Sequence, residues 1–197
     1  TRDQFKKKRN EGIVPLFAII GYTNSGKTTL LNALTNTQKA IDNRPFTTLD
    51  TTTRRITIGG KSKRPILVSD TVGFIRDIPM ELVAAFKTTL EGIVDADALI
   101  HVVDISHPQK EEQILTVRRY LKDMHVSGKP ILMVLNKIDR IYSTLKLNKI
   151  LCRDELSVSC SSLTGENIPE LLKCLEKLFP KQATVNLAIP YQNVSVL

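Results

Sequence analysis

Tryptophan is absent from this sequence, and aromatic residues make up only 5% of its 197 residues. Cysteine is scarce as well: Cys152, Cys160 and Cys174 fall in no metal-ligand spacing, and an odd number gives no disulfide framework. We expect reduced, structural thiols. No run of eighteen apolar residues occurs, so we predict a soluble, cytoplasmic protein with no membrane partner, and we expect a monomer.

Acidic residues are outnumbered by basic ones, 20 against 28, which gives a formal net charge of +8. A basic chain favours polyanionic partners such as RNA, because its charges release counterions from phosphates. The scarcity of aromatic rings limits base stacking, so any RNA contact would be mainly to the backbone. The basic run at residues 6–9 is either part of such a surface or a solvated helix end, and the sequence leaves both interpretations open.

Short apolar runs alternate with longer amphipathic stretches from residue 15 onward, which is typical of βαβ units. We predict an α/β fold with a six-stranded, mostly parallel sheet and helices on both faces. Gly59 and Gly60 suit a tight hairpin, which makes the second strand an antiparallel edge strand. The predicted strands are residues 16–20, 54–58, 66–69, 98–104, 131–136 and 155–159, with a further short strand at 183–189. The predicted helices are residues 27–34, 81–94, 109–124, 144–151 and 168–178.

The segment Gly21-Tyr-Thr-Asn-Ser-Gly26-Lys27-Thr28 fits the pattern G-x-x-x-x-G-K-[ST] between a predicted strand and a predicted helix, the context of a phosphate-binding P-loop. Glycines let the loop fold so that backbone N–H groups and the helix N-terminus point at phosphate oxygens. We expect Lys27 to reach the β- and γ-phosphates and the Thr28 hydroxyl to ligate Mg²⁺. The predicted phosphate-side residues are Gly21, Tyr22, Thr23, Asn24, Ser25, Gly26, Lys27, Thr28 and Thr29.

Two further segments predict nucleotide-dependent switches. Asp70-Thr71-Val72-Gly73 ends the third predicted strand, where Asp70 would hold Mg²⁺ through water and the Gly73 N–H would sense the γ-phosphate. The polar segment at residues 35–53 is too long for a simple connector in a compact domain. One of its threonines could complete the Mg²⁺ shell while the γ-phosphate is bound, although strand propensity explains many of them.

The segment Asn136-Lys137-Ile138-Asp139 follows the fifth predicted strand, at the edge where ligands bind in open α/β sheets. The Asp139 carboxylate can accept hydrogen bonds from guanine N1–H and its 2-amino group, whereas adenine would leave the carboxylate unpaired. We expect Lys137 to lie along the base and Asn136 to tie this loop to the P-loop. The weaker match Ser159-Cys160-Ser161 predicts that the Cys160 N–H donates to guanine O6. Together these motifs predict a domain that binds GTP and GDP.

The segments GYTNSGKTTLLNAL, PFTTLDTTTRR, DTVGFIRDIP and NKID resemble the HflX branch of the Obg-HflX GTPases, over about residues 14–179. The resemblance implies a TRAFAC-class, GTP-hydrolysing G domain at residues 14–180. It also implies binding to the large ribosomal subunit and its rRNA, a role in ribosome splitting or rescue under stress, and stimulation by the ribosome. We expect a fragment without the family's N-terminal domain, in which residues 1–13 are the tail of a helical linker and residues 181–197 a C-terminal extension. By alignment with the family, Thr48 is the Mg²⁺-ligating switch threonine.

Phe74 stands where many GTPases have a glutamine that orients the attacking water. A phenyl ring cannot hold that water, so we predict slow intrinsic hydrolysis that a partner or a cation completes. Asn24 either helps to bind K⁺, as asparagine does at this position in several Era-like GTPases, or only stabilises its loop. A regulatory nucleotide-binding module with negligible hydrolysis is the alternative, whereas a P-loop kinase or ATPase would leave NKID unexplained. The predicted catalytic residues are Asn24, Lys27, Thr48 and Gly73.

Overall fold

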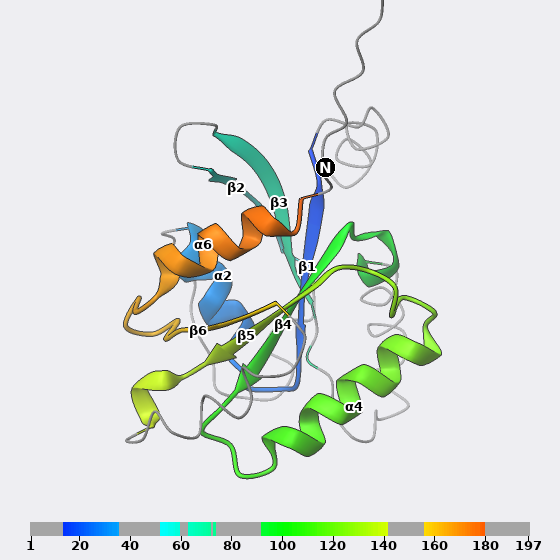
Figure 1. Cartoon of the computed structure of the whole chain (residues 1–197), viewed down its shortest axis with the longest axis vertical. Helices are drawn as coiled ribbons and strands as arrows, with labels where there is room; N and C mark the ends of the chain where they lie inside the picture. The colour runs from blue at the N-terminus through cyan, green and yellow to red at the C-terminus, as the bar shows by residue number, and fades with distance from the viewer. Residues whose placement is uncertain are drawn as a thin grey trace, which may run out of the picture.

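The computed structural model describes residues 14–35, 52–59, 63–71, 73, 92–141 and 156–179. These residues form a six-stranded sheet in the order β2-β3-β1-β4-β5-β6 (Figure 1). Neighbouring strands are parallel except at one edge, where β2 pairs antiparallel with β3, so the predicted sheet is confirmed. The strands are β1 (Leu16–Gly21), β2 (Thr53–Ile58), β3 (Arg64–Asp70), β4 (Ala98–Asp104), β5 (Ile131–Asn136) and β6 (Ser157–Ser159).

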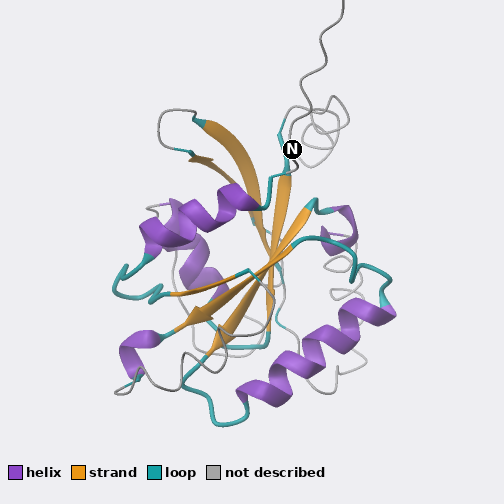
Figure 2. Cartoon of the chain, viewed as in Figure 1, coloured by secondary structure: helices purple, strands orange, loops and turns teal. Residues whose placement is uncertain are grey.

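The helices in the described part of the chain flank this sheet (Figure 2). They are α2 (Lys27–Thr35), α4 (Lys110–Asp123), α6 (Ile168–Lys177) and the short 3₁₀ helix η2 (Ile138–Arg140), with residues 92–95 also helical. The predictions at residues 27–34, 109–124 and 168–178 are therefore confirmed. Residues 81–91 of another predicted helix, the helix at 144–151 and the strand at 183–189 lie outside the described residues.

Both faces of the central strands are buried, with alternate residues packed into apolar clusters on opposite sides of the sheet, whereas the edge strand β2 exposes Arg55 and Thr57. Phe17 and Ile19 of β1 belong to an apolar cluster shared with α2 and α6, whereas Ala18 and Ile20 pack in a cluster with residues of α4. Figure 1 shows the same division, with α2 and α6 on one side of the sheet and α4 on the other. Helices on both faces are thus confirmed.

The loop after β1 lies where the strand order reverses. From β1 the chain proceeds to β2 and β3 on one side, and it then crosses to β4, β5 and β6 on the other. Open α/β sheets bind their ligands at such a switch point, outside the carboxyl ends of the strands. Among the helices that the structure describes, none combines the length and the apolar character needed to cross a bilayer.

Candidate functional site

Two glycines of the P-loop, Gly21 at the end of β1 and Gly26 just before α2, leave no room for a side chain. A Cβ on Gly21 would lie 2.3 Å from the Val102 carbonyl oxygen, and a Cβ on Gly26 would lie 2.3 Å from Asn136 Nδ2. Gly26 also has a φ of 96°, which other residues rarely adopt. The loop therefore lies directly against β4 and the end of β5. The N-terminus of α2 follows it and can attract an anion.

Lys27 is buried at the first position of α2, and its ammonium donates to the carbonyls of Gly21 and Tyr22 at 3.3 and 3.0 Å. Burial lowers the pKa of Lys27 to about 8, although Asp70 opposes this change. Gly73 lies beside the ammonium, because a Cβ on that glycine would be 2.8 Å from Lys27 Nζ. The structure thus brings together the P-loop lysine and the predicted γ-phosphate sensor.

A hydroxyl and a carboxylate meet on the other side of the α2 N-terminus. The Thr28 hydroxyl donates to Asp70 Oδ2 at 2.7 Å, and Asp70 is the last residue of β3. The next residue, Thr71, is fully buried and donates from its hydroxyl to the Ile19 carbonyl at 2.5 Å. Hard oxygen donors of this kind are what Mg²⁺ prefers, together with phosphate oxygens. The described residues contain no cluster of three His, Cys, Asp or Glu side chains that would suggest another metal.

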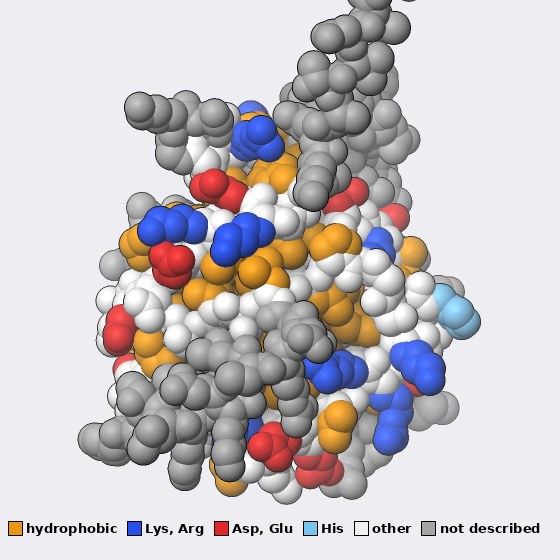
Figure 3. Space-filling view, in the orientation of Figure 1, with side chains coloured by type: hydrophobic (Ala, Val, Ile, Leu, Met, Phe, Trp, Pro, Cys, Tyr) orange, Lys and Arg blue, Asp and Glu red, His pale blue; other side chains and the backbone are white. Residues whose placement is uncertain are grey.

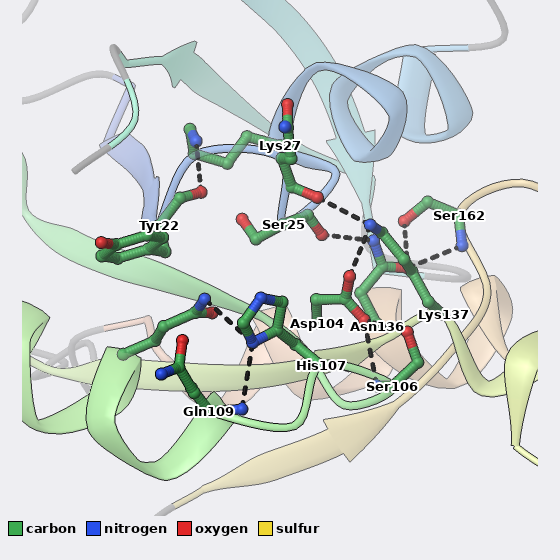
Figure 4. Close-up of polar contacts among 12 residues, drawn as sticks. Tyr22, Ser25, Lys27, Asp104, Ser106, His107, Gln109, Asn136, Lys137 and Ser162 are labelled. Carbon is green, nitrogen blue, oxygen red and sulfur yellow. Dashed lines mark hydrogen bonds and ion pairs between the residues drawn. The ribbon is translucent and has the colours of Figure 1, made fainter. Parts of the chain in front are cut away.

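Asn136 joins the P-loop to the loop that follows β6 (Figure 4). Its Nδ2 donates to the Ser25 carbonyl at 2.9 Å, as predicted for the tie between NKID and the P-loop. Its Oδ1 accepts from the Ser162 N–H at 3.0 Å and from the Ser162 hydroxyl at 2.9 Å. Asn136 is only 2% exposed, so a single buried amide connects three loops at the carboxyl edge of the sheet.

Lys137 has a left-handed backbone conformation, with a φ of 67°. Its ammonium donates to the Asn24 carbonyl at 2.7 Å and forms an ion pair with Asp104 Oδ2 at 2.6 Å. The other carboxylate oxygen of Asp104 accepts from the Ser106 N–H and hydroxyl at 3.0 and 2.5 Å. Burial acts to raise the pKa of Asp104, but the hydrogen bonds from Lys137 and Ser106 outweigh it and hold that pKa below its usual range.

Asp104 was missed by the sequence analysis. A carboxylate at the end of a buried strand, two residues before a serine, is more often read as the start of a turn. Its position could nevertheless have been informative, since the carboxyl ends of parallel strands meet at one edge of a sheet. The serine Ser162 was missed for a similar reason, because serines are common in loops.

The base-contacting loop differs from the prediction at Cys160. Its N–H donates to the Leu135 carbonyl at 2.9 Å and so continues the pairing of β5 with β6, and its side chain is fully buried. Burial also raises the pKa of this thiol to about 12, so it stays protonated. The predicted donation from Cys160 to guanine O6 is therefore wrong. One residue later, the Ser161 hydroxyl donates to Asp139 Oδ1 at 2.5 Å.

The remaining predicted site residues are placed as follows. Asn24 is exposed in the P-loop with a φ of 60°, and Thr23 lies against Gly73. Tyr22 packs at the edge of the cluster under α4, and Ser159 ends β6. Thr48, Val72 and Phe74 lie outside the described residues. Thr29 lies in the first turn of α2.

The fold and these loops define a class of protein. A P-loop at the switch point, a Thr–Asp pair beside it and an N-K-x-D loop locked to it by Asn136 are the parts of a P-loop GTPase domain, or G domain. Residues 16–137 match the family described as 50S ribosome-binding GTPase.

Curated relatives agree with this assignment. The chain is 40% identical to GTPase HflX of Chlamydia pneumoniae over 191 residues, which cover 96% of this chain and 40% of the relative. It is 37% identical to GTPase HflX of Escherichia coli K12 over 196 residues, which cover 97% of this chain and 45% of the relative. The chain therefore belongs to the 50S ribosome-binding GTPase family and, within it, to the HflX GTPases. It spans about two fifths of the length of the curated HflX relatives that it matches.

Solved structures have the same fold. A GTP-binding protein from Sulfolobus solfataricus in complex with GDP is 35% identical, with a TM-score of 0.63, and the match covers 90% of this chain and 56% of that one. A variant of Era from Aquifex aeolicus, bound to GDP and AlF₄⁻, is 26% identical, with a TM-score of 0.71 and coverage of 86% and 58%.

Proposed function

We propose that this chain binds GTP and GDP and hydrolyses GTP. The observation that carries the proposal is the hydrogen bond of 2.9 Å from Asn136 Nδ2 to the Ser25 carbonyl, which fixes the NKID loop against the P-loop. This bond fixes the position of the proposed base site relative to the proposed phosphate site, so that one nucleotide can occupy both. The names of the relatives, GTPase HflX, and the GDP complex of the Sulfolobus protein support the same function.

On the phosphate side, the P-loop N–H groups and Lys27 would bind the β- and γ-phosphates. The Thr28 hydroxyl and Asp70 fit Mg²⁺, and Thr48 would join them in the triphosphate state. When bound, Mg²⁺ would neutralise the charge that develops on the phosphate oxygens. The N–H of Gly73, a residue that lies beside the Lys27 ammonium, would detect the γ-phosphate.

On the base side, Asp139 would accept hydrogen bonds from guanine N1–H and the 2-amino group. The Ser161 hydroxyl on Asp139 Oδ1 orients that carboxylate. The alkyl stem of Lys137 would lie along the base. The Cys160 N–H is occupied, and so are the N–H groups of Ser161, Ser162, Thr164 and Gly165. The Leu163 N–H therefore takes the place of Cys160 as the proposed donor to guanine O6.

Hydrolysis would transfer the γ-phosphoryl group to water, with GDP as the leaving group, and we propose that it is slow in the isolated domain. Phe74 provides no hydrogen bond for the water. K⁺ bound at Asn24 would add positive charge near the phosphates. The Asn24 side chain is exposed and has no hydrogen bond to another described residue. The contact from Lys137 is to the backbone carbonyl of Asn24, not to its side chain. This supports the K⁺ interpretation over a purely structural one.

We further propose that the chain acts in the cytoplasm as a monomer, on the large ribosomal subunit and its rRNA, in ribosome splitting or rescue under stress. The family description and the net charge of +8 support a ribosomal partner. On the face shown in Figure 3, the described Lys and Arg side chains are interspersed with acidic ones. The described residues of this face therefore form no concentrated basic patch.

Nucleotide binding is tested by titrating the chain with fluorescent GDP and ADP in the presence of Mg²⁺. We expect GDP to bind and ADP to bind at least about a hundredfold more weakly, since adenine leaves the Asp139 carboxylate unpaired. Equal affinities would contradict guanine selectivity and would favour a P-loop kinase or ATPase.

Hydrolysis and the ribosomal role need separate measurements. Single-turnover cleavage of GTP, in K⁺ and in Na⁺ and with and without large ribosomal subunits, should show faster cleavage with K⁺ and with subunits. Equal rates in the two salts would exclude the K⁺ role, and no cleavage under any condition would favour a regulatory module. Co-sedimentation with large subunits in GTP and GDP then tests binding directly.

A further inference from the structure

Asp104 belongs to none of the four nucleotide motifs, yet it lies among them. It is the last residue of β4, and its register partner on β5 is Asn136. The two strands therefore deliver Asp104 and the NKID loop to the same edge of the sheet, next to the P-loop (Figure 4). The Asp104 residue as a whole is 8% exposed, so its charge is largely removed from water.

The Asp104 carboxylate is held on both of its oxygens. Ser106 donates twice to Oδ1, and the Lys137 ammonium donates to Oδ2 at 2.6 Å. This arrangement leaves the carboxylate little freedom to rotate. It presents one oxygen to Lys137 in a fixed direction, and the hydrogen bond is of the short, charge-assisted kind.

The Lys137 side chain needs such a partner. Its four-carbon stem has about 2 kcal/mol of rotamer entropy to lose, and its backbone is in a left-handed conformation. The ammonium bridges from Asp104 to the Asn24 carbonyl at 2.7 Å. Together with the bond from Asn136 to the Ser25 carbonyl, this contact fastens two successive P-loop carbonyls to the NKID loop.

We infer that Asp104 is a positioning residue of the nucleotide site, which holds the Lys137 stem along the guanine and the Lys137 ammonium on the P-loop. The inference rests on the proposed function. Asp104 touches no part of the nucleotide in this scheme, and it acts only through Lys137. Without its charge, the Lys137 ammonium would turn toward water, and both the base contact and the Asn24 tie would weaken.

A purely structural role for the ion pair is the competing explanation. Buried ion pairs contribute little net stability, because desolvation offsets much of the attraction. The two explanations differ in what Asp104→Asn should change. A structural ion pair would affect unfolding, whereas a positioning residue would affect GDP affinity and would do so only while Lys137 has its ammonium.

The test is a double-mutant cycle on the 197-residue chain, with GDP affinity as the readout. Asp104→Asn is expected to weaken GDP binding about tenfold, as for other residues coupled within one hydrogen-bond network. In a Lys137→Met background, which keeps a long stem without the charge, the same change should have no further effect. Ser106→Ala should weaken GDP binding less, and again only when Lys137 is intact.

Asp97→Asn is the matched control. Asp97 directly precedes β4 at the opposite edge of the sheet, where its carboxylate accepts from the Leu16 N–H at 2.7 Å. This variant should leave GDP affinity unchanged. The ratio of GDP to IDP affinity should also stay constant in Asp104→Asn, because Asp139, not Lys137, recognises the 2-amino group.

Two results would overturn the inference while leaving the proposed function intact. These are additive effects of Asp104→Asn and Lys137→Met on GDP affinity, or a changed GDP to IDP ratio. A wild-type chain that does not bind GDP would instead overturn the proposed function, and the inference with it.

Discussion

The Ser25 hydroxyl is buried in the P-loop and has no hydrogen-bond partner among the described residues. Only the backbone of this residue is used, since its carbonyl accepts from Asn136. A buried hydroxyl without a partner costs about 1–3 kcal/mol of desolvation. Ser25 thus lowers the stability of the loop that it helps to build.

Replacing this hydroxyl should stabilise the domain. Ser25→Ala is expected to raise the free energy of unfolding by about 1 kcal/mol, as measured by urea denaturation, with GDP affinity preserved. Ser162→Ala is the control, because its hydroxyl does have a partner in Asn136, and it should lower the free energy of unfolding by about 1 kcal/mol. A loss of stability in both variants would show that the Ser25 hydroxyl has a partner after all.

Lys27 should make nucleotide affinity depend on pH. With its pKa lowered to about 8 by burial, the free site begins to lose this charge above pH 8, whereas a bound phosphate would restore it. Binding then takes up a proton, and GDP affinity should fall by up to about tenfold for each pH unit above this pKa. Titrations between pH 7 and 9 measure the slope. Lys27→Arg keeps its charge throughout and should give a flat profile, so a wild-type profile equally flat would contradict the prediction.

The same lowered pKa has the opposite consequence for folding. Below pH 8 the lysine is charged in both the folded and the unfolded chain, and burial of that charge destabilises the fold. Between pH 8 and the unfolded-state value of 10.5, the folded chain gives up the proton first. The contribution of Lys27 to stability therefore increases with pH across this window, while nucleotide affinity decreases.

Strands β1 and β3 are joined beyond their last register pair, Ile19 and Asp70, by the hydrogen bond from the Thr71 hydroxyl to the Ile19 carbonyl. Thr71→Val removes the hydroxyl at nearly constant volume and leaves the buried Ile19 carbonyl without that donor. We expect a loss of about 1–2 kcal/mol in the free energy of unfolding. Thr71→Ser retains the hydroxyl and should recover most of the loss. A Thr71→Val variant as stable as the wild type, with the loss confined to Thr71→Ser, would instead assign the effect to packing of the methyl group.

The central strands were predictable because both of their faces are buried. Their apolar runs are nearly continuous, so β4 and β5 begin and end at the predicted residues. The P-loop and NKID were predictable because their spacing is set by phosphate and base geometry. The loop after β6 was not, since a run of serines around Cys160 offers several registers and only backbone pairing selects one. Asp104 was missed because its role depends on a neighbour 33 positions away in the chain.

The sheet of the whole domain has apolar clusters packed on both of its faces, and the site lies at the carboxyl edge of the strands that these clusters hold. Nucleotide binding should therefore stabilise the entire domain. GDP at a hundred times its dissociation constant is expected to add about 2.7 kcal/mol to the free energy of unfolding. Urea denaturation followed by circular dichroism, with ADP at the same concentration as control, measures the gain. An equal gain with ADP would contradict guanine selectivity.

In the NKID tetrapeptide, the side chain that holds the P-loop is buried, whereas the side chain proposed to recognise the base is exposed. Asn136 is enclosed and leaves no room for a side chain at Gly26, whereas Asp139 is exposed and its carboxylate accepts a hydrogen bond from the Ser161 hydroxyl. A larger residue at Gly26 therefore requires a change at Asn136 as well, which restricts how the phosphate side of the site can evolve. The choice of base, by contrast, depends on Asp139, whose side chain is exposed and is not confined by packing. A lineage of such domains could therefore acquire a new nucleobase preference while inheriting its phosphate machinery intact.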